Sequence, residues 1–209
     1  MTTKEKILIA TLELASEQGL GSVSLSQIAK KVGIQKPSLY NHFTSKDEII
    51  DGLYEYLRQR AKDKVANTMI DYGELVKNKS ALEILTQTVN SYMAINRDAD
   101  MEQFYKFVMS ERSIQKEAAK IMLVETEKMI LATKQLFYAM QVQHIMEFQN
   151  IDMAAFSYAM TIHSIMDYMY DQRMAGVEVT AEQMLDDYLK EFCSVYGNEQ
   201  SYEEKIDEK

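Results

Sequence analysis

The residues best suited to chemistry lie in a basic segment between Ser22 and Lys46. This segment contains four lysines and no acidic residue, although the chain of 209 residues carries a formal net charge of -9. Hydroxyl, amide, phenol and imidazole groups lie among the lysines, which are Lys30, Lys31, Lys36 and Lys46. Such donors, with no carboxylate nearby in sequence, suit phosphate oxygens and the edges of bases. The segment is therefore a candidate contact surface for a polyanion.

The charge is distributed unevenly along the chain. Residues 1–50 contain six lysines and five acidic residues, whereas the remainder contains 17 basic and 27 acidic residues. A locally basic segment on an acidic chain is typical of nucleic-acid binding. Charge alone also fits a solvated lysine face with no partner. The secondary structure that carries these side chains is needed to distinguish this alternative from nucleic-acid binding.

Enzymatic chemistry has little support in the sequence. The motifs G-x-S-x-G, G-x-x-x-x-G-K-[ST], H-E-x-x-H and G-x-G-x-x-G are all absent. Cys193 is the only cysteine, so an internal disulfide and a zinc site built from cysteines are excluded. No histidine lies near Cys193 in sequence to activate it as a nucleophile. We expect a protein that is not an enzyme, with no catalytic residue and no cofactor.

The histidines leave one other kind of chemistry open. His163 and Asp167 are four residues apart, a spacing that places both on one side of a helix and can bind a metal. Two ligands are too few, so a hydrogen-bonding role in a pocket is favoured and no metal site is predicted. His144, near a helix end, leaves haem ligation as an alternative.

The composition predicts an all-α fold. One proline and seven glycines in 209 residues favour long helices with few breaks, and no stretch alternates as a strand would. No run of about 18 apolar residues is present, so no membrane span is expected. The single cysteine suits the cytoplasm, where we expect the protein to be.

Three short helices are predicted before a long one. The first has an apolar face that includes Ile7 and Leu8 and ends at Gly19. The second begins at Ser24, which forms a capping box with Gln27. It ends at a tight turn, after which the third helix follows at once.

The third helix begins near Pro37, a residue suited to a first turn. Leu39 and Phe43 are four apart and can face the core, which leaves Lys36, Ser38, Tyr40, Asn41 and His42 facing outward. For Tyr40 and His42, packing against the first helix is the alternative. Two helices joined by a tight turn at Gly33 form a helix-turn-helix, whose second helix enters the major groove of DNA.

The long fourth helix begins with a second capping box. Ser45 and Glu48 have the spacing S-x-x-E, and Lys46 lies in the first turn. Free amides and the helix dipole favour an anion there. Lys46 is therefore predicted to bind a phosphate.

The segments "ILIATLELASEQG", "SLSQIAKKVGI" and "KPSLYNHFTSKDEII", in this order, resemble the N-terminal domain of TetR-type (TetR/AcrR) transcriptional regulators. The resemblance covers roughly the first fifty residues and implies an operator-binding domain whose third helix reads DNA. The matching DNA-contact positions are Ser24, Ser26, Lys36, Pro37, Ser38, Tyr40, Asn41, His42 and Lys46. It gives Tyr40, His42 and Lys46 mainly phosphate contacts, and Lys36 and Ser38 a share of base readout.

Gln35 departs from the family pattern. It stands where many TetR-type proteins have a serine that caps the third helix. Because glutamine is a poorer cap, we include Gln35 among the candidate DNA-binding residues.

The remaining chain predicts several amphipathic helices. Gly73 and the polar run "VKNKS" mark a break, Ser80 caps residues 81–96, and a further break lies at residues 97–100. A short aromatic helix precedes a long one over residues 114–141. Asn150 or Asp152 caps a helix that ends at Gly176, and Thr180, with Gln183, caps the last.

Methionine and aromatic residues gather in the middle helices. They can fill a core, but as a group they favour a hydrophobic or aromatic effector. The resemblance implies a helical ligand-binding domain whose last two helices pair across a two-fold axis. The candidate ligand-binding residues are Phe104, Tyr105, Met109, Met122, Met129, Phe137, His163, Met166 and Asp167. The candidate dimer interface comprises Phe156, Met160, Tyr170, Met184, Tyr188 and Phe192.

These features predict a helix-turn-helix DNA-binding domain over residues 1–46, continued by a linking helix over 46–66. A ligand-binding and dimerisation domain over 47–197 and an acidic, disordered tail over 198–209 follow. We expect a homodimeric, ligand-responsive repressor that binds a near-palindromic double-stranded operator and is released by a hydrophobic or aromatic small molecule. Control by a protein partner, by haem or by a metal is the alternative.

Overall fold

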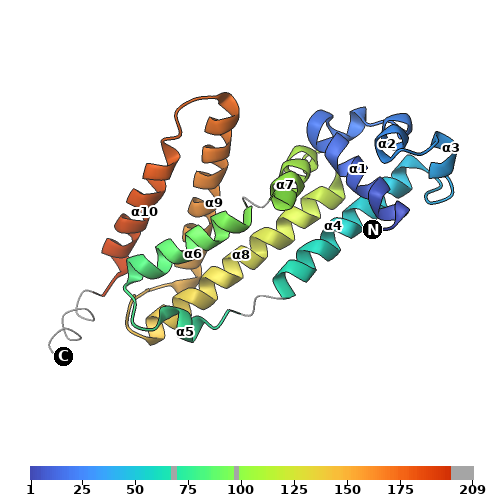
Figure 1. The fold of residues 1–209 in the computed structure, drawn as a ribbon. Coiled ribbons are helices and arrows are strands. Elements are labelled where there is room, and N and C mark those ends of the chain that lie inside the picture. Colours follow the sequence, from blue (N-terminus) through green and yellow to red (C-terminus); the bar gives the residue numbers. More distant parts are fainter. Residues whose placement is uncertain (67–69, 97–98, 199–209) are drawn as a thin grey trace. The chain divides into compact units, whose positions relative to one another are not determined.

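The structure is a computed structural model that describes residues 1–66, 70–96 and 99–198. The chain is all-α, as predicted. Figure 1 shows the helices in chain order. They are α1 (Thr3–Gln18), the 3-10 turn η1 (Leu20–Ser22), α2 (Leu25–Val32), α3 (Lys36–Leu39), α4 (Lys46–Ala66), α5 (Tyr72–Val76), α6 (Ala81–Asn96), α7 (Ala99–Glu111), α8 (Lys116–Val142), α9 (Ile151–Ala175) and α10 (Ala181–Tyr196).

Within these ranges, no helix is both long and apolar enough to cross a membrane. The expected acidic tail from residue 199 onward, and residues 97–98 of the expected break, lie outside the described residues.

The described helices pack into two compact units. The first comprises Met1–Met69 and Ala94–Glu125, and the second Ile70–Met93 and Thr126–Lys209. Residues 94–125 therefore pack with the N-terminal helices, whereas the sequence analysis assigned them to the C-terminal domain. This division concerns packing, and the functional boundary near residue 46 stays a prediction.

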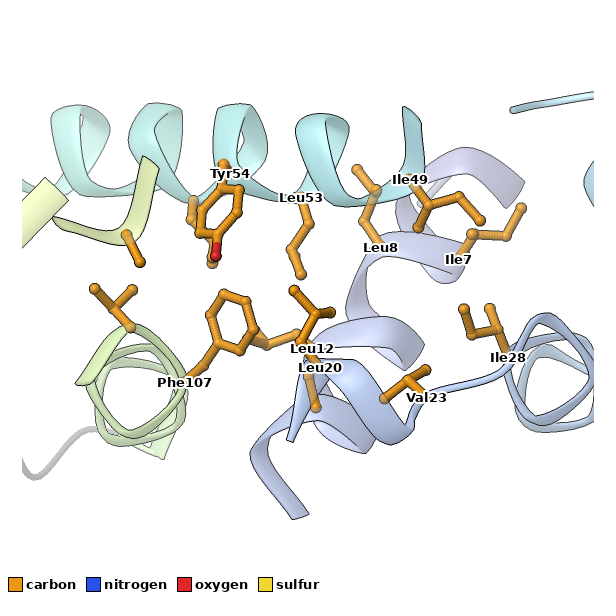
Figure 2. Packing of buried hydrophobic residues seen from close by; sticks show 14 of the residues in the cluster. Ile7, Leu8, Leu12, Leu20, Val23, Ile28, Ile49, Leu53, Tyr54 and Phe107 are labelled. Atoms are coloured by element: carbon orange, nitrogen blue, oxygen red, sulfur yellow. The ribbon is translucent and has the colours of Figure 1, made fainter. Parts of the chain in front are cut away.

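The core of the first unit lies between α1, α4 and α7. Ile7 and Leu8 of α1 are buried beside Ile49 of α4, and Tyr54 of α4 points toward Phe107 (Figure 2). The ring of Tyr54 lies 5.6 Å from that of Phe107 on α7. Burial of these large side chains joins α7 to the N-terminal helices.

The core of the second unit is rich in aromatic rings. Phe137 of α8 stacks on Phe148 at 4.6 Å and contacts Tyr158 of α9 and Phe192 of α10. Phe192 is buried, and its ring also lies 4.7 Å from that of Tyr196. Much of the aromatic content of the last three helices is therefore used in packing.

Two of the predicted caps are confirmed in the second unit. Ser80 and Glu83 form a reciprocal capping box at the start of α6, and Asn150 accepts a hydrogen bond from the amide of Met153 at the start of α9. The prediction that Gly73 marks a break is wrong, because Gly73 lies inside α5. The break is at the polar run that follows.

The predicted cap of the last helix is also wrong. Thr180 has a helical backbone conformation, and its side chain accepts no hydrogen bond from the first turn of α10. Gln172 of α9 replaces it: Gln172 Oε1 accepts from the amide of Ala181 at 3.1 Å, and Nε2 donates to Thr180 Oγ1 at 2.9 Å. Gln183 instead donates to Asp187. The start of α10 is thus capped by the neighbouring helix.

Replacement of Gln172 by alanine should lower the free energy of unfolding by about 1–3 kcal/mol, because the buried amide of Ala181 loses its acceptor. The control is Gln183→Ala at the exposed position that the sequence favoured, which should change stability by less than about 0.5 kcal/mol. Chemical denaturation measures both. Equal losses would contradict the assignment of the cap to Gln172.

Candidate nucleic-acid interface

The helix-turn-helix predicted from the sequence is present in the first unit. Ser24 Oγ accepts from the amide of Gln27, whose Oε1 accepts from the amide of Ser24, so both halves of the capping box form. Gly33 ends α2 in the left-handed region at φ 79°, a conformation that side chains with a Cβ disfavour. The amide of Ile34 then donates to the carbonyl of Ala29 and closes the turn.

The segment after the turn is shorter than a full recognition helix. Regular helix covers only Lys36–Leu39, and hydrogen-bonded turns continue it to Phe43. Leu39 and Phe43 are 1% and 2% exposed and fix the segment to the core. This confirms their predicted inward orientation.

The polar side chains of this segment face solvent. Tyr40 is 51% exposed and His42 is exposed, so the alternative that they pack against α1 is wrong. Ser38 is half-buried. The other exposed candidates of the interface are Ser24, Ser26, Gln35, Lys36, Pro37 and Asn41.

Gln35 precedes α3 in an extended conformation, and its side chain makes no capping hydrogen bond. Gln35 as a whole is exposed. The structure therefore gives Gln35 no local role that would compete with a contact to DNA.

At the start of α4, one half of the predicted capping box forms and the other half has a different partner. Ser45 Oγ accepts from the amide of Glu48 at 3.1 Å, as expected. The Glu48 carboxylate, however, accepts from the amide and hydroxyl of Thr44, one residue before the cap. These hydrogen bonds lower the pKa of Glu48.

Lys46 has a contact that the sequence analysis missed. Its ammonium donates to the carbonyls of Leu20 at 3.1 Å and Gly21 at 3.4 Å, between α1 and α2. An ammonium has three donors, so a phosphate contact would add to these bonds.

The other side of Leu20 is bound as well. Its amide donates to Oε1 of Glu111, at the end of α7, at 3.0 Å. Glu111 is 6% exposed and was not identified from the sequence, because 91 residues separate it from Leu20. We define the Leu20 clamp as Leu20 with Glu111 and Lys46.

One lysine of the basic segment is neutralised. Lys31 lies 2.8 Å from the carboxylate of Glu13 and 4.0 Å from that of Glu17. The hydrogen bond with Glu13 raises the pKa of Lys31. The positive side of the interface therefore depends mainly on Lys30, Lys36 and Lys46.

The candidate ligand-binding residues are divided between the two units. Phe104, Tyr105, Met109 and Met122 belong to the core of the first unit, whereas Phe137 is buried in the second and Met166 packs against that core. Met129 lies on α8 within the second unit and is half-buried.

His163 and Asp167 lie on the side of α9 opposite to its buried residues, with 3.8 Å between Nε2 and Oδ2. Among the described residues, no group of three histidine, cysteine or acidic side chains comes together around them or elsewhere. Cys193 is half-buried, and burial raises the pKa of its thiol to about 11. A reactive thiolate is therefore not favoured at neutral pH.

The candidate dimer residues divide by exposure. Phe156 and Tyr170 on α9 and Met184 on α10 are exposed, and Met160 and Tyr188 are half-buried. Phe192 is 7% exposed inside the aromatic core, so it has no surface to offer a partner. Met153 and Met174 extend the exposed side of α9 and were missed by the sequence analysis.

Comparison with known proteins agrees with this geometry. Residues 7–53 match the family "Bacterial regulatory proteins, tetR family". The uncharacterized HTH-type transcriptional regulator YvdT of Bacillus subtilis is 39% identical over 61 residues, 29% of this chain and 31% of that protein. The nucleoid occlusion factor SlmA of Aliivibrio fischeri is 28% identical over 94 residues, 44% of this chain and 46% of SlmA.

These matches span less than half of the length of either relative. Among solved structures, the SmeT–triclosan complex superposes with a TM-score of 0.66 at 13% identity and covers 95% of this chain and 93% of SmeT. At that identity the likeness concerns the fold. The architecture and the exposed turn define a helix-turn-helix protein. Within that class, residues 7–53 form a domain of the tetR type.

Replacement of Glu111 by alanine should lower the free energy of unfolding by about 1–3 kcal/mol, because the buried amide of Leu20 loses its acceptor. Exchange of the Leu20 amide proton should accelerate. Glu111→Gln retains an acceptor oxygen, so its free energy of unfolding should fall by less than that of Glu111→Ala. The control is Glu102→Ala, at an exposed position of the same helix. Unchanged protection of Leu20 in Glu111→Ala would contradict the clamp.

Proposed function

We propose that this protein is a ligand-responsive transcriptional repressor that binds a near-palindromic DNA operator as a homodimer. A hydrophobic or aromatic small molecule releases it from the operator. The observation that carries this proposal is the exposed, donor-bearing surface of a helix-turn-helix within a tetR-family domain. The sequence from Ser22 to Lys46 contains no acidic residue.

The side chains divide into two roles. Lys36 and Ser38 lie on α3, the element that enters the major groove in this motif, and are assigned base contacts. Tyr40, His42 and Lys46 follow α3 and are assigned phosphate contacts. Phosphate contacts set affinity and its dependence on salt, whereas base contacts set sequence preference.

A selection from random DNA should yield a near-palindromic site, and binding to it should weaken as salt rises. Lys36→Ala should reduce affinity. At one position of each half-site, it should also remove about 1–3 kcal/mol of discrimination between the preferred base and the others. Lys46→Ala should weaken binding to all sequences and reduce the salt slope by about 1. Gel-shift titrations at several salt concentrations measure both effects.

Lys190→Ala, on the surface of α10, is the control and should bind as the unaltered protein does. A Lys46→Ala variant with weaker binding but an unchanged salt slope would show that Lys46 acts only through Leu20. Absence of any sequence-specific, salt-sensitive binding would remove the proposal.

The dimer is proposed from the exposed side of α9. Residues on this side recur at alternating steps of three and four, the spacing of a helix–helix seam. They are Met153, Phe156, Met160, His163, Asp167, Tyr170 and Met174. Met184 and Val195 of α10 add exposed apolar area on the neighbouring helix. Apolar side chains arranged in this way favour a partner helix.

A charge in this seam should separate the protomers. Phe156→Glu should convert the dimer to a monomer in light scattering, because a carboxylate would be buried without a partner. Tyr168→Glu is a matched control, since Tyr168 lies on another side of α9 and both side chains are 46% exposed. Dissociation by both variants, or by neither, would contradict this interface.

The SmeT–triclosan complex has the same fold, which supports a small-molecule effector. Such an effector must bind the DNA-bound and released forms with different affinities, or it cannot shift the equilibrium between them.

A further inference from the structure

A cation from the start of α1 lies beside the segment that follows α3. The ammonium of Lys4 is 5.0 Å from the centre of the Phe43 ring. Phe43 comes directly after His42 and three residues before Lys46, both of which are assigned phosphate contacts. Lys4 was not identified from the sequence, because it precedes the basic segment and only the fold brings it to Phe43.

Both sides of this contact are firmly held. The amide of Thr2 donates to Oε2 of Glu5 at 2.6 Å, and the amide of Glu5 donates to Thr2 Oγ1 at 3.2 Å, so a complete capping box fixes the first turn of α1. The Phe43 ring is 2% exposed, and a Cβ on Gly52 of α4 would lie 3.1 Å from it. An ammonium is attracted to the face of an aromatic ring. The charge of Lys4 is therefore held next to the turn between α3 and α4.

The charge of Lys4 is not used by a carboxylate. Lys4 is exposed, and among the described residues it takes part in none of the ion pairs, in contrast to Lys31. Glu5, its neighbour in sequence, is bound to the amide of Thr2. An aromatic ring offers the ammonium no oxygen, so its three donors can still bind one. Lys4 also lies in the first turn of its helix, where free amides and the helix dipole favour an anion.

One acidic side chain lies close to Lys4. The Glu48 carboxylate accepts from the amide and hydroxyl of Thr44. These hydrogen bonds, with a smaller effect of the Lys4 charge, lower the pKa of Glu48. Glu48 is exposed and shares the first turn of α4 with Lys46, so its negative charge repels a phosphate there. Lys4 offsets that repulsion, and an experiment has to separate this indirect effect from a direct contact with DNA.

We propose that Lys4 binds a backbone phosphate of the operator, beside the phosphate assigned to His42. The DNA interface then extends beyond the helix-turn-helix to the first turn of α1. An ammonium is a compact charge with no fixed donor geometry, so Lys4 adds affinity and salt dependence but no base preference. This inference rests on the proposed function and adds a residue to its DNA interface.

Gel-shift titrations of the full chain on the selected operator test this contact. Lys4→Met keeps most of the apolar stem and removes the charge. It should reduce the magnitude of the slope of log affinity against log salt by about 0.9, the value for one phosphate contact. The loss of affinity should therefore be about 3.5-fold larger at 50 mM than at 200 mM salt. Preference among bases should not change.

Two variants at the same end of α1 are the controls. Lys4→Arg keeps a cation and should keep the slope of the unaltered chain. Lys6→Met removes an exposed charge about 200° around the same helix and should change neither affinity nor slope. Thermal melts check that each variant folds. Equal slopes for Lys4→Met and Lys6→Met would overturn the proposal.

Substitution of Glu48 separates the direct contact from the indirect effect. Glu48→Gln removes the negative charge and retains an oxygen that accepts from Thr44. Adding Lys4→Met to Glu48→Gln should again reduce the slope by about 0.9. If Lys4 acted only by offsetting Glu48, the added substitution would have no effect, and the phosphate contact would be refuted.

Brief acetylation of the lysine amines, read by mass spectrometry, gives a second measurement without any substitution. Bound operator should slow the reaction of Lys4 and leave that of Lys6 unchanged, whereas equal rates at Lys4 with and without operator would contradict the contact.

Failure of this inference differs from failure of the proposed function. A chain that binds its operator with sequence preference and salt sensitivity, but with the same slope in Lys4→Met, would overturn the Lys4 contact alone. Absence of any sequence-specific, salt-sensitive binding by the unaltered chain would remove the proposed function, and the Lys4 contact with it.

Discussion

The packing of the first unit depends on the hydrogen bonds of the backbone amide and backbone carbonyl of Leu20. Leu20 is 2% exposed, between two helices. A buried peptide group without hydrogen-bond partners is costly. Its amide is bound by a carboxylate from the end of α7 and its carbonyl by an ammonium from the start of α4. Both partners are charged and come from different helices. The 3-10 turn η1, which contains Leu20 and joins α1 to α2, is therefore held to both α4 and α7.

This arrangement explains why residues 94–125 belong to the N-terminal unit. The rings of Tyr54 and Phe107 meet in the core, Arg58 pairs with Glu117 at 2.8 Å, and Glu111 reaches Leu20. An apolar contact, an ion pair and a buried hydrogen bond thus join the same two segments.

Local patterns predicted the helix-turn-helix well. Caps at Ser24 and Gly33 depend only on neighbouring residues, and both form. The inward pair Leu39 and Phe43 follows from helical spacing and is buried. The Tyr40 and His42 side chains are exposed, as that spacing requires.

Contacts between distant segments could not be predicted in this way. Glu111 is an acid at the end of an aromatic helix, and nothing near it in sequence indicates Leu20 as its partner. Gln172 is one of many polar residues on α9, and only the fold brings it to the amide of Ala181. The methionine and aromatic content predicted a hydrophobic effector but could not show that Phe104 and Phe137 pack in two separate cores.

The shortness of α3 limits how much information one protomer can read from DNA. With one turn of helix, few side chains can reach base edges, and each bidentate contact distinguishes bases by only about 1–3 kcal/mol. A genome offers about 10⁶–10⁹ competing sites, more than so few contacts can discriminate against. Under the proposed function, two protomers must therefore read together. Selectivity then depends as much on the distance between two reading surfaces as on the residues within either.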